Sequence, residues 1–184
     1  LMQRTKWIAA GAMAAVLLLA AISRPYEKPA VPSFHGPTRL VSNSGIICLE
    51  GESSPYNGPV EELYPNGNKK YSLEIVDGVK QGKATQWYMN GKKKTEVILK
   101  DGQPIGTMRG WHENGKKMIK GNTNNGKANG LQIRWHENGQ KRYEGNFKDG
   151  QIDGLIQEWH ENGRKLGEEN YKDGKFIEGS TKYW

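Results

Sequence analysis

Residues 135–158 read WHENGQKRYEGNFKDGQIDGLIQE, and the same pattern starts again at Trp159. The stretch holds one Asn-Gly and one Asp-Gly pair. These are the strongest short-range signals for a β-hairpin, because both residues tolerate positive φ in a primed turn. Gly154 closes an Asp-Gly-x-x-x-Gly connection, where a β-bulge or a close backbone approach needs glycine. The stretch therefore predicts two strands for each unit, over about 131–136 and 140–148, joined by tight turns.

Residues 135–158 are one copy of a strict repeat of 24 residues. Five copies cover residues 63–184, and we interpret residues 40–62 as a degenerate capping repeat. A fixed period of this length is the signature of an array whose units are held together by contacts with their neighbours. The predicted fold is all-β: a single-layer antiparallel β-meander of 24-residue hairpin repeats. The recurring glycines are Gly67, Gly91, Gly115, Gly139 and Gly163, then Gly78, Gly102, Gly126, Gly150 and Gly174, then Gly82, Gly106, Gly130 and Gly154.

The composition fits a thin sheet and excludes several classes of protein. Of 184 residues, 35% are hydrophobic and 24 are glycine, so a large globular core is not expected. Cys48 is the only cysteine of the chain, which excludes an intrachain disulfide and a structural zinc site built on cysteines. A ribbon of hairpins needs little interior, and this accounts for the low apolar content.

The first 22 residues have the pattern of a targeting segment. Arg4 and Lys6 precede an unbroken run of small and apolar residues over 7–22, WIAAGAMAAVLLLAAI. A positive flank followed by roughly 7–15 apolar residues is typical of a secretory signal. As a helix the run would reach about 24 Å, short of the ~30 Å hydrocarbon core. Residues 1–22 are therefore predicted to be a signal peptide or a membrane anchor, with a buried structural helix as the third interpretation.

The targeting segment also predicts the location of the repeats. A positive flank stays in the cytoplasm, so the rest of the chain is expected outside it, periplasmic or secreted. If the segment is retained, residues 7–22 anchor the protein in the inner, cytoplasmic membrane. Residues 23–39 carry four prolines and are predicted to be an extended, semi-rigid linker.

Aromatic residues share the period and form the first candidate binding surface. In one interpretation the tryptophans are the main apolar filler of a thin sheet, because large aromatics dominate burial where few other apolar groups exist. In the other, they are an exposed platform for an extended polymer such as a glycan or a peptide. These residues are Trp87, Trp111, Trp135 and Trp159.

The position after each tryptophan invites a metal hypothesis, which the spacing argues against. It holds His112, His136 and His160, and equivalent strands of successive copies lie about 10 Å apart. Zinc ligands must all lie within about 2.1 Å of one ion, so we expect no metal site and no cofactor, and interpret the histidines as solvent-facing edge residues. The repeated residues do not converge on one acid–base site either, so the protein is predicted not to be an enzyme.

Charge supplies the second candidate surface. Residues 63–184 hold 22 Lys/Arg and 15 Asp/Glu, which accounts for the whole formal charge of +7. One interpretation is protection of exposed edges against aggregation; the other is a strip for an anionic partner. The expected partners are a protein or an anionic envelope or phospholipid surface, and not nucleic acid. The lysines that recur two positions after each Asn-Gly are Lys69, Lys93, Lys117, Lys141 and Lys165.

The repeat also resembles a known family. Copies of the form Trp/Tyr-x-Glu-Asn-Gly-x-Lys, followed by Gly-Asn-Phe-Lys-Asp-Gly-x-x-x-Gly, are similar to the MORN-repeat variant of bacterial proteins, many of them YwqK-type antitoxins. The resemblance covers about 63–184 and is strongest in the last three copies. It implies a β-meander with a binding or scaffolding role and no catalytic residues. The expected function is a non-enzymatic scaffold outside the cytoplasm; the alternative is an antitoxin that neutralises a partner toxin by direct contact.

Overall fold

The computed structural model describes residues 40–184, so the predicted signal or anchor (1–22) and linker (23–39) lie outside the described residues. Within 40–184 the chain forms strands and turns only, and this part contains no helix that could cross a membrane. The strands are β1 (Leu40–Asn43), β2 (Ile46–Leu49), β3 (Gly58–Leu63), β4 (Lys69–Val76), β5 (Val79–Trp87), β6 (Lys93–Lys100), β7 (Gln103–Trp111), β8 (Lys117–Asn124), β9 (Lys127–Trp135), β10 (Lys141–Lys148), β11 (Gln151–Trp159), β12 (Lys165–Lys172), β13 (Lys175–Phe176) and β14 (Lys182–Tyr183).

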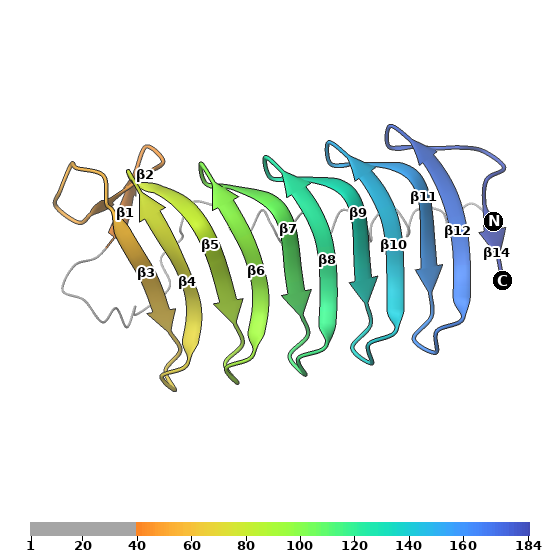
Figure 1. Ribbon diagram of the computed structural model, residues 1–184, viewed down its shortest axis with the longest axis horizontal. Coiled ribbons are helices and arrows are strands. Elements are labelled where there is room, and N and C mark those ends of the chain that lie inside the picture. The colour runs from red at the N-terminus through yellow and green to blue at the C-terminus, as the bar shows by residue number, and fades with distance from the viewer. Residues whose placement is uncertain (1–39) are drawn as a thin grey trace.

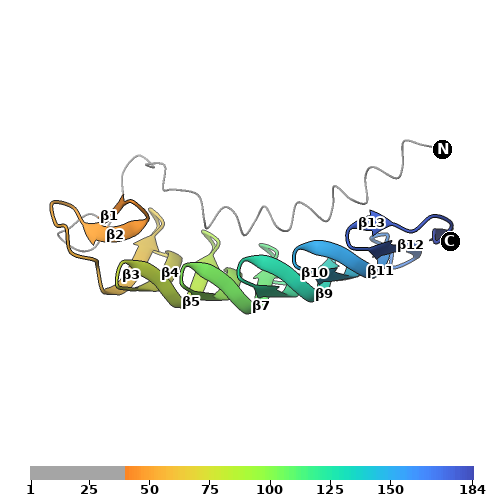
Figure 2. The same ribbon diagram turned by 90° about the horizontal axis from the view of Figure 1, so that it is seen from above.

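The main sheet has 12 strands and confirms the predicted antiparallel meander. Its strands follow one another in chain order from β3 to β13, and β14 also pairs with β12. Figure 1 shows the hairpins side by side in one row, and Figure 2 shows the same row as a single layer. The segment predicted as a cap, 40–62, divides into two parts. β1 and β2 form a sheet of their own, whereas β3 is the first strand of the main sheet.

The two kinds of turn differ in conformation. Both residues of each Asp-Gly pair have positive φ, for example 51° at Asp149 and 87° at the glycine after it, as the primed turn requires. The same is true of Asn125 and Gly126, which take the place of an Asp-Gly pair, whereas in the five Asn-Gly pairs at the opposite edge only the glycine has positive φ, 91° at Gly139. The Gly139 N–H donates to the His136 carbonyl at 2.9 Å, and the His136 N–H donates to the Gln140 carbonyl at 2.9 Å. The predicted primed turn is therefore wrong at this edge, which has a three-residue loop ending on a left-handed glycine.

The third recurring glycine, which the first four copies carry, lies in a β-bulge, as predicted. β9 starts at Lys127, four residues before the predicted strand, because it continues through the bulge. Its pairing with β8 shifts between Ala128 and Gln132, and Gly130, between them, has φ 79°. Since a bulge bends its strand, the hairpins of Figure 2 are curled, not flat.

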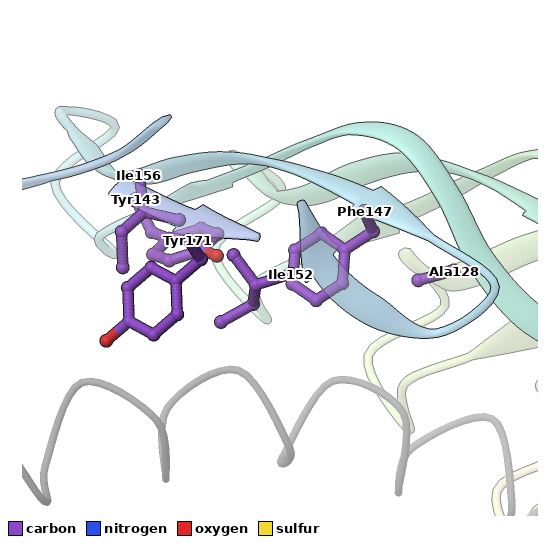
Figure 3. Packing of buried hydrophobic residues seen from close by; sticks show 6 residues of the cluster. All are labelled: Ala128, Tyr143, Phe147, Ile152, Ile156 and Tyr171. Atoms are coloured by element: carbon purple, nitrogen blue, oxygen red, sulfur yellow. The ribbon is translucent and has the colours of Figure 1, made fainter. Parts of the chain in front are cut away.

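Side chains alternate between the two faces of the sheet, and the faces differ in composition. We call the face with the buried apolar side chains the inner face and the opposite face the outer face. Figure 3 shows one inner-face cluster, in which side chains from β9, β10, β11 and β12 meet. This cluster contains Ala128, Tyr143, Phe147, Ile152, Ile156 and Tyr171, and a second one contains Ala84, Val97, Leu99, Met108 and Ile119.

Glycine and large residues face each other within this inner layer. Gly145 pairs with Ile156 across β10 and β11, and Ile156 is only 1% exposed. A Cβ atom added to Gly145 would lie 2.6 Å from Cγ2 of Ile156, which is closer than real Cβ contacts allow. The missing side chain of the glycine therefore makes room for the isoleucine.

A recurring backbone bond joins adjacent copies at the Asp-Gly edge. The N–H of Gly126 donates to the carbonyl of Pro104 at 3.0 Å, and the N–H of Gly150 donates to that of Ala128 at 2.9 Å. Gly174 makes the same bond to Ile152 at 2.8 Å. The backbone bond recurs whichever residues vary around it, and in some copies a side chain adds to it, as where the Asp101 N–H donates to Oε1 of Gln81 at 3.2 Å.

Candidate binding surface

The tryptophans and lysines form one alternating row on the outer face, beside the Asn-Gly turns. Each tryptophan ends a strand and pairs with the lysine that begins the next, as Trp111 does with Lys117. Each lysine also reaches over the ring of the tryptophan that follows along the row. The ammonium-to-centroid distances are 6.0 Å for Lys69 over Trp87, 5.9 Å for Lys93 over Trp111, 5.7 Å for Lys117 over Trp135 and 4.9 Å for Lys141 over Trp159.

The row continues to the last residue of the sequence. Lys165 lies 4.4 Å from the ring centroid of Trp184, which occupies the place that a tryptophan holds in the other copies. Cation–π contacts of this kind contribute about 0.5–1 kcal/mol at exposed sites. All four internal tryptophans are half-buried. A ligand on this row would therefore meet the aromatic rings and the ammonium groups together.

Most lysines of this row are neutralised by a carboxylate of the outer face. Lys93 lies 2.8 Å from Glu96, Lys141 2.5 Å from Glu144 and Lys165 2.7 Å from Glu168, each pair three residues apart. Lys69 forms an ion pair with Glu61. The predicted cationic strip is thus interrupted by acids, and Lys117 alone among its five lysines has no carboxylate within 4.0 Å in the described part of the chain.

Glu96 shows how strongly these cations act on one carboxylate. It lies 2.9 Å from Lys83, 2.8 Å from Lys93 and 3.7 Å from Arg109. Hydrogen bonds from Lys93 and then Lys83 lower the pKa of the Glu96 carboxyl to about 2, against a smaller opposing effect of burial. The outer face of β5–β7 therefore holds more positive charge than its own acids balance.

Two of the three histidines join successive copies instead of facing the solvent. Nε2 of His112 donates to the carbonyl of Trp135, and Nε2 of His136 donates to that of Trp159, both at 2.9 Å. In the first two copies Tyr64 and Tyr88 donate to the equivalent carbonyls. The prediction of solvent-facing edge residues is wrong for His112 and His136, which are half-buried. It holds for His160, which is exposed.

The asparagines of the Asn-Gly turns have two roles that the predicted turn does not include. Oδ1 of Asn138 accepts the N–H of Gln140 at 2.8 Å, which shapes its own turn. Nδ2 of Asn114 donates to the carbonyl of Glu137 in the next copy at 2.8 Å, and Asn66 and Asn90 do the same. The signal was present in the sequence, because all five copies place asparagine before this glycine.

Comparison with known families identifies the hairpins. The sequence matches the family described as MORN repeat variant over residues 104–125, 128–149 and 152–173. The chain carries MORN repeat variants. The matched stretches correspond to the hairpins β7–β8, β9–β10 and β11–β12, each centred on its Asn-Gly turn. No curated protein matches the chain. Repeats of this family are modules that bind proteins or membranes.

The last MORN repeat variants also carry inner-face polar groups that depart from the repeat. Glu169 is 1% exposed, and its carboxylate accepts a hydrogen bond of 2.8 Å from the Tyr171 hydroxyl. It occupies the position of Gly145 one copy earlier. Burial raises the pKa of the Glu158 carboxyl, and burial followed by the hydrogen bond to Glu169 raises that of the Tyr171 hydroxyl.

Arginine and tyrosine stack beside these acids. The Arg134 guanidinium lies 5.4 Å from the ring centroid of Tyr143, whose hydroxyl is buried. Burial raises the pKa of this hydroxyl strongly and lowers the pKa of Arg134. Within residues 40–184, no group of three or more His, Cys, Asp or Glu side chains is arranged to hold a metal ion. These inner-face groups occur once each, so the period gave no signal for them.

Proposed function

We propose that this protein is a non-enzymatic scaffold, located outside the cytoplasm, that binds a protein or an envelope surface through its outer face. The observation that carries the proposal is the alternating row of half-buried tryptophans and lysines, which the repeats hold in one line along the sheet. Tryptophan is among the residues that dominate binding energy at interfaces, and lysines attract the acidic groups of a partner. The location rests on the apolar run over 7–22 and its positive flank.

A binding role suits these residues better than catalysis. The row presents the same pair of groups again and again, whereas acid–base chemistry needs different groups that converge on one reacting atom. Its histidines are engaged in bonds between copies, as His112 and His136 show. These residues therefore supply a continuous surface and no nucleophile with an activating base.

The test is an affinity capture from the native envelope with the full chain as bait. A photo-crosslinking residue at Ile133, on the outer face between Trp135 and Leu131, reports the surface that is used. Crosslinking of one reproducible partner from Ile133, and none from the inner-face position of Ile152, is the expected result. Equal crosslinking from both positions would contradict the choice of face. A carboxy-terminal reporter that is active only in the cytoplasm would contradict the location.

The alternative function is that of a YwqK-like antitoxin which neutralises a toxin by direct contact. The MORN repeat variants favour it through the resemblance of their Trp-x-Glu-Asn-Gly pattern to that group. Its test is genetic: co-expression of this chain should rescue cells from the product of a neighbouring toxic gene. Rescue together with a cytoplasmic reporter signal would replace the scaffold proposal, and failure of rescue would remove the alternative.

A further inference from the structure

The third hairpin, β7–β8, departs from the charge pattern of its neighbours at one position. In the following and preceding copies the residue three places after the row lysine is a glutamate, namely Glu96, Glu144 and Glu168. Each of these accepts an ion pair from its lysine. In β8 the same position is Lys120, so Lys117 and Lys120 are both cations where three of the other four copies hold a cation and an anion and the first holds Lys69 and Ser72.

Arg109 adds a third cation to this position. Its Cα pairs directly with that of Lys120 across β7 and β8, so two like charges lie opposite each other on the outer face. Such pairs are unfavourable, and within residues 40–184 only Arg109 of the two has a carboxylate within 4.0 Å. The nearest acid is Glu96, at 3.7 Å from Arg109, and it already accepts ion pairs from Lys83 and Lys93. Lys117 and Lys120 have no ion pair with any residue in 40–184.

The repeats around these three cations are also the most positively charged part of the array. Residues 79–150, which form the hairpins from β5 to β10, hold 15 Lys/Arg against six Asp/Glu. The units on either side are acidic. Residues 55–78 hold two basic and four acidic residues, and residues 151–174 hold three and six. The array is thus positive at its centre and negative toward both ends.

We propose that Arg109, Lys117 and Lys120 are the docking site for an acidic segment of a protein partner, whose carboxylate takes the place of the glutamate that this copy lacks. Trp135, under the ammonium of Lys117, and the neighbouring Ile133 supply the apolar contact beside it. The acidic ends argue for a local peptide, because a flat anionic membrane along the whole array would be repelled at both ends. The inference rests on the proposed binding function and names its site and the chemistry of its partner.

The test uses the full chain and a labelled ten-residue peptide of alternating glutamate and serine, with a glutamine version as the neutral control. Lys120→Glu introduces the glutamate of three other copies and should weaken binding about tenfold, since it removes one attraction and adds a repulsion. Lys120→Gln should weaken it less. Lys148→Glu makes the same charge change at an exposed outer-face position of β10 and should stay within about twofold of the unmodified chain.

Stability separates this role from a structural one. Lys120→Glu relieves the like-charge pair with Arg109 and allows an ion pair with Lys117, so its melting temperature should equal or exceed that of the unmodified chain. A variant that melts no lower but binds at least fivefold more weakly supports the site. Equal peptide binding by Lys120→Glu and the unmodified chain overturns it, as does equal binding of the glutamine peptide.

Further outcomes show whether the anion belongs to a lipid or to a peptide, and they separate the docking site from the proposed scaffold function. If Lys120→Glu weakens binding to anionic vesicles but leaves binding to the peptide unchanged, the three cations bind lipid, and the peptide site is overturned. All variants share residues 7–22, so comparing them cancels any vesicle binding by that segment. Crosslinking from Ile133 that persists in Lys120→Glu would overturn the docking site while the scaffold stands. Peptide binding without any crosslinked partner would contradict the scaffold and leave the site in place.

Discussion

The inner and outer faces of this sheet use the same 24-residue period for different purposes. The inner face varies its residues but keeps them buried, so that Val97, Gly145 and Glu169 occupy equivalent positions. The outer face keeps its tryptophans and lysines nearly constant while leaving them half-buried or exposed. Packing requires only that neighbouring volumes fit, whereas a row of contacts requires the same groups in every copy. The period of the sequence is therefore carried mainly by the turns and the outer face.

Among substitutions that test the difference between the two faces, the largest loss of stability is expected on the inner face. Ile156→Ala removes a side chain that is 1% exposed, and it should lower the free energy of unfolding by about 3 kcal/mol. Leu155, the next residue, points to the outer face and is 37% exposed, so Leu155→Ala should cost less than about 1 kcal/mol. Urea denaturation of both variants measures the difference. Equal losses would mean that the two faces are not distinct in stability.

A smaller loss is expected from the outer-face row. Trp135→Ala removes a half-buried ring and its contact with Lys117, and we expect about 2 kcal/mol less stability in a chain that still unfolds cooperatively. Circular dichroism and the crosslinking assay together decide between the two interpretations of the tryptophans. A folded variant that no longer binds supports a platform. Loss of the cooperative transition would instead assign the row to structure.

Two histidines at equivalent positions beside the Asn-Gly turns, His136 and His160, form a matched pair. His136→Ala removes the bond to the carbonyl of Trp159 and should cost about 1 kcal/mol of stability. His160 holds the equivalent position in the next copy but is exposed, so His160→Ala should change the stability by less than half as much. Thermal unfolding of the two variants makes the comparison. A loss for His160→Ala as large as that for His136→Ala would exclude the inter-copy bond as the cause.

The smallest effects concern pH and have opposite signs on the two faces. On the outer face the folded pKa of Glu96, about 2, lies below the unfolded value of 4.5. Its contribution to stability is present above pH 4.5 and is lost as the pH falls toward 2. On the inner face burial raises the folded pKa of Glu158 above the unfolded value of 4.5. Stability therefore falls as the pH rises from 4.5 through the folded pKa.

Substitution by glutamine isolates each of these contributions. Glu96→Gln should be less stable than the unmodified chain at pH 6 and close to it near pH 2. Glu158→Gln should gain stability relative to the unmodified chain as the pH rises from 4 to 7. Urea midpoints across this range provide the measurement, and parallel pH profiles for the two variants would contradict the assignment of the two carboxylates to different environments.

The fold was predictable because its signals are local and repeated. Each Asn-Gly and Asp-Gly pair marks a turn by itself, and the bulge glycine follows at a fixed distance. The conformation of the Asn-Gly turn was harder to predict. Asn138 avoids positive φ because its side chain accepts the N–H of Gln140, a bond that competes with the primed turn. The residue pair alone does not show which of these two conformations wins.

The site was predictable in its residues but not in its contacts. Lys141 and Glu144 stand three apart, which in a regular strand places them on opposite faces. The register shift between Lys141 and Tyr143 turns both side chains to the outer face, where they form an ion pair. The inner-face groups Glu169 and Arg134 occur at one copy each, so no repetition marks them. The function and location of the chain remain predictions for the experiments above.

From β3 to β12 each strand of the main sheet pairs with the strand that follows it in the sequence, and the side-chain bonds that join successive copies span no more than 23 residues. Closing such short loops costs little entropy, so folding can start at any hairpin and spread to both sides. Unfolding should then begin at the ends of the array, where a hairpin has a neighbour on one side only. Shortening the chain by one whole hairpin would lower its stability by one interface and leave the central copies, with Arg109 and Lys120, intact.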